Sequence, residues 1–171
     1  VNACDAVFTA IEAARGAATL VSYDPNVRLK LWPAARARAI VLETIAQVDV
    51  CLPSLEDAAI LFGERAPEAY VDLLLERGAR LVALKLGRDG VLVATAEERE
   101  HVAGFVVESV DATGAGDTFD GAFLTERLRG ATLTAAARYA NAAAALATRG
   151  YGAVDPIPRR AEVERFLSES G

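Results

Sequence analysis

Short apolar runs alternate along the chain with longer segments of helical periodicity. The runs, rich in Val and Leu, predict buried strands, and they span residues 19–23, 48–52, 81–86, 91–95 and 102–107. The longer segments predict helices, several of them bounded by proline or glycine, and they span residues 6–17, 34–47, 54–62, 67–78, 117–128, 133–148 and 160–167.

This alternation of strands and helices predicts an α/β fold with a largely parallel sheet. The turn at residues 87–90 joins two of the strands directly, which adds a hairpin and some antiparallel pairing. Ligands of such sheets lie beyond the carboxyl ends of the strands. A binding site is therefore expected in the loops that follow Tyr23, Leu52, Leu86 and Val110.

The composition is that of one globular domain. With 171 residues, of which 53% are hydrophobic and 25% charged, the chain can bury a core and is too apolar for a disordered protein. A net charge of −6 without a Lys/Arg cluster argues against a nucleic-acid partner. No uncharged apolar run could cross a membrane. Two cysteines fit a reducing compartment, so we expect a cytoplasmic protein.

The start of the chain is unusual. It begins at Val1, and the sequence contains no methionine. The first 18 residues lack the basic region, long apolar run and cleavage site of a signal peptide. We expect a processed protein or part of a longer one.

The most informative segment is the glycine-rich sequence DATGAGDTFDGAF at residues 111–123. Gly114 and Gly116 permit a tight turn and a close approach of a ligand to the backbone. The helix expected to start near Asp117 directs its free N–H groups at this loop, which suits a phosphoryl group. The Asp117 carboxylate would repel a bound phosphate unless a hydroxyl lay between them. Asp117 would then accept the hydroxyl proton during phosphoryl transfer.

Other interpretations of this segment remain. Asp117 could simply cap a helix after a flexible loop. A dinucleotide fingerprint needs the spacing G-x-G-x-x-G, which Gly114, Gly116 and Gly121 do not have, and a Walker A sequence is absent. A phosphoryl-binding loop and a capped helix are the two alternatives that stay open.

The segment resembles the second signature of the PfkB (ribokinase-like) carbohydrate kinases, D-T-T-G-A-G-D-x-F-x-G, from which only Ala112 departs. The resemblance implies that Asp117 is the catalytic base and contacts the substrate. It implies an anion hole formed by the backbone of three residues, Gly114, Ala115 and Gly116. Asp111 and Thr113 would belong to a neighbouring monovalent-cation site, with K⁺ as the candidate ion.

A second element, DPNVR at residues 24–28 followed by LWP at 31–33, resembles the D-P-N-x-R…L-W sequence of fructokinases and 2-keto-3-deoxygluconate kinases. Arg28 offers a two-pronged guanidinium to a carboxylate or phosphate. The resemblance implies that Arg28 binds the substrate and that Asn26 belongs to the ATP site. A surface arginine after an Asp-Pro turn is the alternative.

The sequence PSLEDA at residues 53–58 falls where the family has an N-x-x-E element linked to magnesium. Ser54 replaces the asparagine and Asp57 replaces the glutamate, which keeps oxygen ligands suited to a hard cation. Asp57 and Glu56 are therefore the candidate Mg²⁺ ligands. The alternative is that Ser54 only caps the following helix.

Two more elements point to the nucleotide. KLGRDG at 85–90 resembles the K-L-G-x-x-G turn beside the nucleotide phosphates, which implies that Lys85, Gly87 and Gly90 contact ATP; a hairpin with a surface lysine is the alternative. Asn141 resembles the helical asparagine near the adenine, and a packed helix with one tolerated polar residue is the alternative. We interpret His101, the single histidine, as a surface residue.

The resemblance covers the whole chain but maps onto only the C-terminal part of the family. It implies a ribokinase-like three-layer α/β/α fold with a mainly parallel sheet, incomplete at its N-terminal side. Residues 1–171 would be the ATP-binding and catalytic part, with the sugar-binding and lid portion absent, so we expect the sequence as given to be incomplete for activity.

The implied function is ATP-dependent phosphorylation of a sugar or keto-sugar acid, most similar to 2-keto-3-deoxygluconate, with ATP and Mg²⁺ as cofactors. Fructose or another ketose is the alternative substrate. A non-catalytic nucleotide-binding fragment is the alternative function. We expect the intact protein to form a homodimer or larger homo-oligomer.

Overall fold

Five strands with the order β1-β2-β3-β4-β5 form the sheet in the computed structural model, which describes residues 3–170. The described chain divides into two compact units: the first runs to residue 84 and includes residues 94–99, and the second comprises residues 85–93 and those from 100 onward. Each unit holds a different part of the predicted site.

The first unit contains a parallel arrangement of β1 (Ser22–Tyr23), β2 (Val50–Cys51) and the start of β3 (Leu81–Lys85). Ser22 is paired with Val50, and Val50 with Leu81. The first four residues of β3 are apolar and buried, as expected for a parallel strand covered on both faces. The helices of this unit are α1 (Ala3–Gly16), α2 (Ala34–Ile45), α3 (Leu55–Phe62) and α4 (Pro67–Glu76).

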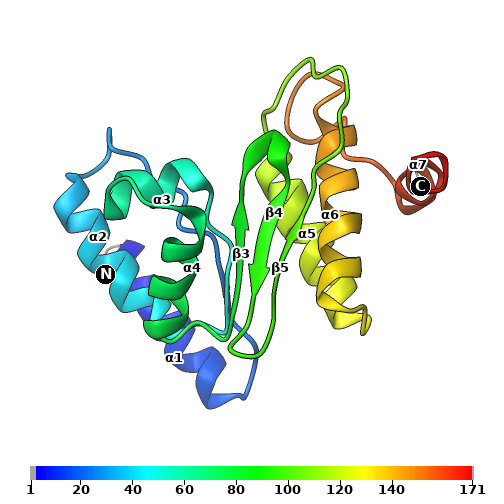
Figure 1. Ribbon diagram of the computed structural model, residues 1–171. Helices are drawn as coiled ribbons and strands as arrows, with labels where there is room; N and C mark the ends of the chain where they lie inside the picture. The colour runs from blue at the N-terminus through cyan, green and yellow to red at the C-terminus, as the bar shows by residue number, and fades with distance from the viewer. Residues whose placement is uncertain (1–2, 171) are drawn as a thin grey trace. The chain divides into compact units, whose positions relative to one another are not determined.

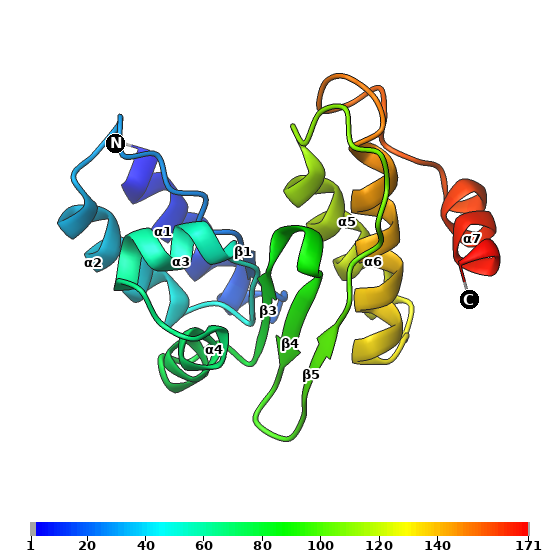
Figure 2. The ribbon, with the colours of Figure 1, turned by 45° about the horizontal axis from the view of Figure 1, so that its top comes forward.

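The second unit contains the turn η1 (Gly87–Asp89), most of β4 (Val91–Ala94) and β5 (Arg99–Val102), and the helices α5 (Ala115–Leu128), α6 (Leu133–Ala147) and α7 (Arg160–Glu169). Figures 1 and 2 show α6 between α5 and α7. The buried face of α6 is rich in alanine, whose small side chains let helices approach closely. Val163 of α7 packs against α6, where it forms a buried cluster with Ala142 and Ala143.

The helix predictions are confirmed to within a few residues, whereas the strands are shorter than predicted. The strand expected at 102–107 is wrong: β5 ends at Val102, and residues beyond it leave regular structure. The Asn141 side-chain amide donates hydrogen bonds to the carbonyls of Val102 and Ala103. These carbonyls are then not available to pair with a neighbouring strand. Val106 is then fully exposed.

Two expectations from the composition concern the cysteines and membrane-spanning segments. Cys51 is buried and Cys4 half-buried, and within residues 3–170 neither is part of a disulfide. Within residues 3–170, none of the helices combines the length and apolar character that a bilayer crossing requires.

Candidate functional site

The glycine loop turns at Gly114, which precedes α5 with φ 76° and ψ 2°. This left-handed conformation is unfavourable for residues with a Cβ. A Cβ at this position would also lie 2.8 Å from the Cβ of Ala153 and 2.9 Å from its Cα. Backbone conformation and space therefore both require glycine here, and the turn brings α5 to its start at Ala115.

The backbone amides at the start of α5 are only partly used within the protein. The Thr118 amide donates to the Gly114 carbonyl at 2.9 Å, and the Ala115 amide donates to the Ala112 carbonyl at 3.2 Å. In the described part of the chain, the amides of Gly114, Gly116 and Asp117 have no acceptor. These N–H groups, at the positive end of α5, can bind an oxyanion.

Asp117 is the third residue of α5 and is exposed. Over residues 3–170, its carboxylate has no hydrogen-bond or ion-pair partner. The residue at the N-cap is Gly114, and no side chain caps this helix. Asp117 therefore does not act as a capping acceptor, and its carboxylate is available to a ligand.

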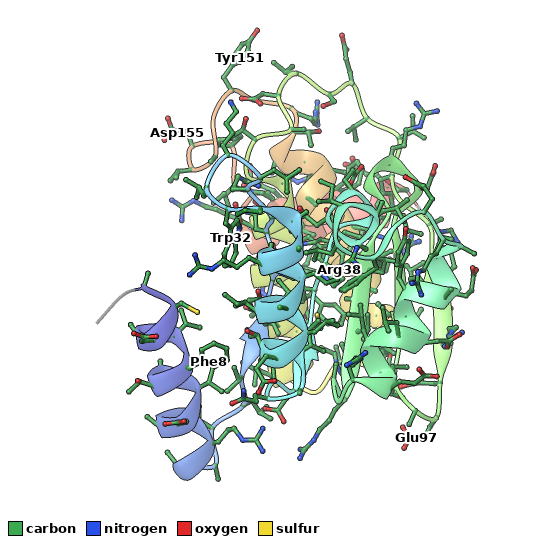
Figure 3. The ribbon with its side chains drawn as sticks, turned by 90° about the vertical axis from the view of Figure 1, so that its left-hand side faces the viewer. Phe8, Trp32, Arg38, Glu97, Tyr151 and Asp155 are labelled. Carbon is green, nitrogen blue, oxygen red and sulfur yellow. The ribbon has the colours of Figure 1, made fainter. Side chains whose placement is uncertain are left out.

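Asp111 fastens the other end of the glycine loop. Its Oδ1 accepts from the amide and hydroxyl of Thr113 at 2.9 and 2.7 Å, and its Oδ2 accepts from the Gly152 amide at 2.9 Å. The Thr113 hydroxyl, followed by the amides of Gly152 and Thr113, lowers the pKa of the Asp111 carboxyl below its usual value. The carboxylate thus joins the loop to the segment after α6, where Tyr151 projects outward (Figure 3).

Lys85, the last residue of β3, is not a surface lysine. Its Nζ lies 3.0 Å from both Oδ1 and Oδ2 of Asp120, and the two side chains are 11% and 13% exposed. The turn that follows is closed by the Leu86 amide, which donates to the Gly90 carbonyl at 2.8 Å. Lys85 and Asp120 thus join the end of β3 to the second turn of α5.

Asn141 and Gly90 both contact the end of β5. The Asn141 side-chain amide donates to the carbonyls of Val102 and Ala103 at 2.9 and 3.1 Å. A Cβ at Gly90 would lie 2.1 Å from the Val102 carbonyl oxygen. The polar residue inside α6 is therefore satisfied by backbone, and its place near adenine stays a prediction.

His101 also contacts the turn at residues 87–90. Its Nε2 lies 2.8 Å from the Asp89 carbonyl oxygen. His101 is exposed, as predicted, but it also holds the turn in which Gly87 and Gly90 were predicted to contact ATP.

In the first unit, the loop after β1 alternates buried and exposed residues. Pro25 and Val27 are buried, whereas Asn26 and Arg28 are exposed. The Arg28 Nη1 donates to the Asn26 Oδ1 and, at 3.0 Å, to the Val27 carbonyl. The two polar side chains predicted to bind ligands are therefore neighbours, held outward by two buried ones.

Ser54 and Asp57 both form hydrogen bonds at the N-terminus of α3, in the same unit. Ser54 caps α3, because its Oγ accepts from the Asp57 amide at 3.0 Å, so the capping role is confirmed. The Asp57 Oδ2 accepts from the Ser54 hydroxyl at 2.8 Å, and the Asp57 Oδ1 accepts from the Val27 amide at 3.0 Å. Glu56 is exposed beside them.

Asp57 and Glu56 are the carboxylates predicted to bind magnesium. Among residues 3–170, no group of three or more His, Cys, Asp or Glu residues could hold a metal ion. Mg²⁺ is usually held by one or two carboxylates together with waters and substrate phosphates. Glu56 and Asp57 fit that limited role, since a carboxylate can accept more than one contact per oxygen.

Asp120 is a contact residue that the sequence interpretation missed. It stands at a variable position of the glycine-loop signature, three residues after Asp117. Residues three apart lie on neighbouring positions of a helix surface. A second carboxylate three residues after Asp117 was the signal in the sequence that could have indicated a role for Asp120. Its partner Lys85, 35 residues away in the chain, could not be identified from a local pattern.

A family model described as pfkB family carbohydrate kinase matches residues 1–160. The chain belongs to the pfkB family of carbohydrate kinases. It is 37% identical over 140 residues to an ATP-dependent 6-phosphofructokinase of Thermoanaerobacterium thermosaccharolyticum, covering 81% of the chain and 44% of that protein. It is 34% identical over 156 residues to a 2-dehydro-3-deoxygluconokinase of Bacillus subtilis, covering 90% and 48%.

Solved structures of similar sequence share the fold. A putative ribokinase II from E. coli in complex with ATP and Mg²⁺ has a TM-score of 0.89 at 32% identity, covering 97% of this pfkB-family chain and 54% of that one. A fructokinase from Vibrio cholerae with fructose, ADP and calcium bound has a TM-score of 0.87 at 33% identity, covering 95% and 55%. The α/β fold is ribokinase-like, and the chain spans about half the length of the curated relatives it matches.

Proposed function

We propose that the full-length protein transfers the γ-phosphoryl group of ATP to a hydroxyl of a keto-sugar acid, with 2-keto-3-deoxygluconate as the substrate. The observation that carries this proposal is the exposed, unpaired Asp117 carboxylate beside the free amides at the start of α5, within the described residues. A base next to an anion site suits the transfer of a phosphoryl group to a hydroxyl.

In this reaction Asp117 accepts the proton of the attacking hydroxyl. The hydroxyl oxygen forms a bond to the γ-phosphorus, the bond from that phosphorus to the β,γ-bridging oxygen breaks, and ADP leaves. The amides of Gly114 and Gly116 stabilise the charge on the transferring group. Magnesium would neutralise phosphate charge when bound, and Glu56 and Asp57 would hold it, directly or through water.

The nucleotide and the metal are supported by the solved relatives. The E. coli protein was solved with ATP and Mg²⁺, and the V. cholerae fructokinase with ADP. K⁺ at Asp111 and Thr113 is a further proposal, because these two side chains bring a carboxylate oxygen and a hydroxyl oxygen within 2.7 Å of each other.

The acidic substrate is supported by Arg28 and by the B. subtilis 2-dehydro-3-deoxygluconokinase, whose substrate is also called 2-keto-3-deoxygluconate. Arg28 is exposed on a loop end, and a guanidinium can pair with a carboxylate in two-pronged fashion. Fructose is the second candidate, because fructokinases are among the relatives and solved neighbours.

The test is a coupled assay of the full-length protein with ATP, Mg²⁺ and a panel of neutral ketoses and 2-keto sugar acids. We expect the highest kcat/KM with 2-keto-3-deoxygluconate. Preference for fructose would reject the acidic substrate and retain the kinase. ATP binding without turnover of any sugar in the panel would favour the non-catalytic alternative.

A further inference from the structure

The ion pair between Lys85 and Asp120 lies directly beside the glycine loop. A Cβ added to Gly116 would be 3.7 Å from the Nζ of Lys85. Gly116 is the second residue of α5, and its amide is one of those left without an acceptor among the described residues. The ammonium group therefore sits next to the amides that can bind an oxyanion.

This location is electrostatically unfavourable for a lysine without a carboxylate. The N-terminus of a helix carries a partial positive charge, which repels an ammonium group. Burial adds a desolvation cost, since both side chains are mostly buried. The two Asp120 oxygens, both 3.0 Å from the Nζ, offset these costs and restrict the ammonium to one place.

We propose that Asp120 is a positioning residue that holds the Lys85 ammonium beside the glycine loop, where it binds the β- or γ-phosphate of the nucleotide. The inference deepens the proposed function and rests on one part of it, the binding of ATP. Asp117 and Asp120 then have different roles on one helix: the exposed carboxylate of Asp117 faces the hydroxyl, and the largely buried carboxylate of Asp120 orients the ammonium group.

A purely structural ion pair would join β3 to α5 without touching a ligand, and a double variant separates the two roles. Replacing a buried pair by apolar residues of similar volume often leaves stability unchanged, whereas removing one partner is costly. Lys85→Met together with Asp120→Leu should therefore recover the thermal stability that either single variant loses. Only a phosphate-binding role predicts that the double variant still lacks a ligand contact.

The readout is the affinity of the full-length protein for ATP and for AMP, measured by calorimetry without sugar. We expect Lys85→Met and the double variant to weaken ATP binding about tenfold or more and to leave AMP binding unchanged, because loss of a charge-assisted contact acts only on the β- and γ-phosphates. Asp120→Asn should lose part of the ATP preference, and Asp120→Glu should restore some of it.

Glu126→Gln is the matched control. Glu126 is on the same helix, its side chain is also 13% exposed, and it forms an ion pair with Arg160 of α7. This variant should lose stability but keep the ratio of ATP to AMP affinity. A double variant that regains both stability and ATP preference would overturn the inference. Loss of ATP and AMP affinity in equal measure would do the same.

The kinase proposal is judged separately by the sugar assay. A wild-type protein that phosphorylates no sugar, but whose ATP preference depends on Lys85, would refute the kinase and keep the positioning role. A wild-type protein that phosphorylates a sugar, with ATP affinity unchanged in the double variant, would refute only the positioning role.

Discussion

The Asp57 carboxylate accepts a hydrogen bond from the Val27 amide at 3.0 Å, which fastens the loop carrying Asn26 and Arg28 to the first turn of α3. Val27 is buried, so water cannot easily replace the carboxylate. Asp57, which stands where the family has a glutamate, therefore has a structural role in anchoring this loop.

Removing this acceptor should destabilise the protein. Asp57→Ala leaves the Val27 amide without its acceptor, and we expect a loss of about 1–3 kcal/mol in the free energy of unfolding. Asp57→Asn keeps an acceptor oxygen and should cost less. Chemical denaturation without magnesium measures both. Glu56→Gln, on the same turn but exposed, is the control and should change stability little; an equal loss in that variant would contradict the anchoring role.

The glycine loop should not tolerate a methyl group at its turn. Gly114→Ala places a Cβ in the left-handed region and within 2.8–3.0 Å of Ala153, so we expect a loss of roughly 2–4 kcal/mol, from strain and overpacking together. Nucleotide affinity should fall as well, because the amides of the loop shift.

Gly121→Ala is the matched control for that prediction. Gly121 lies inside α5, and a Cβ there meets nothing within 4 Å. Alanine is a better helix former than glycine by about 1 kcal/mol. The variant should therefore be as stable as the wild type or more so in the same denaturation series. If both alanine variants behaved alike, the close approach of Ala153 would not matter.

Local patterns predicted the helices and the glycine loop, because periodicity, caps and the glycine spacing are all contained in short stretches of sequence. Contacts between distant residues escaped prediction. Lys85 and Asp120 are 35 residues apart, and Val27 and Asp57 are 30 apart. The strand wrongly predicted at 102–107 also reflects a distant contact. Asn141, 39 residues beyond Val102, donates a hydrogen bond to the Val102 carbonyl, where β5 ends.

The stability contribution of Asp111 should disappear in acid. Its folded pKa lies below the usual 3.8, so the unfolded state binds the proton more tightly. The contribution is therefore complete above the unfolded pKa and is lost as the pH falls through that value toward the folded pKa. The Oδ1 of an asparagine at this position can still accept from Thr113, but its Nδ2, which takes the place of the Asp111 Oδ2, cannot accept from the Gly152 amide.

Denaturation of the wild type and of Asp111→Asn between about pH 7 and pH 2 measures this effect. The difference in unfolding free energy between the two proteins should be constant near neutrality and should shrink in acid. The other carboxylates are common to both proteins, so their contributions cancel in this difference. A difference that stayed constant down to the lowest pH would show that Asp111 is not stabilised as a carboxylate.

Asp117 should be required for turnover and not for nucleotide binding. In the full-length protein, Asp117→Asn removes the proton acceptor while keeping nearly the same shape, so kcat should fall by about 10²–10⁴-fold. ATP affinity should be unchanged or slightly higher, because a negative charge near the phosphates is removed. The measurements are steady-state kinetics and ATP titration, and a variant that kept most of its kcat would exclude the base role.

The role of Arg28 is tested by comparing an acidic with a neutral substrate. Its guanidinium is held by Asn26 and the Val27 carbonyl, so it is oriented before a ligand arrives. If it reads a carboxylate, Arg28→Lys keeps the charge but loses the two-pronged geometry. The KM for 2-keto-3-deoxygluconate should then rise about tenfold, in line with the loss of one charge-assisted contact. The KM values for ATP and for fructose should change little.

The competing role for Arg28 is a contact with the ATP phosphates. That role predicts equal losses with the acidic and the neutral sugar, because both reactions use the same nucleotide. Equal losses on both sugars in Arg28→Lys would remove the argument for an acidic substrate, because the guanidinium would then act on what the two reactions share.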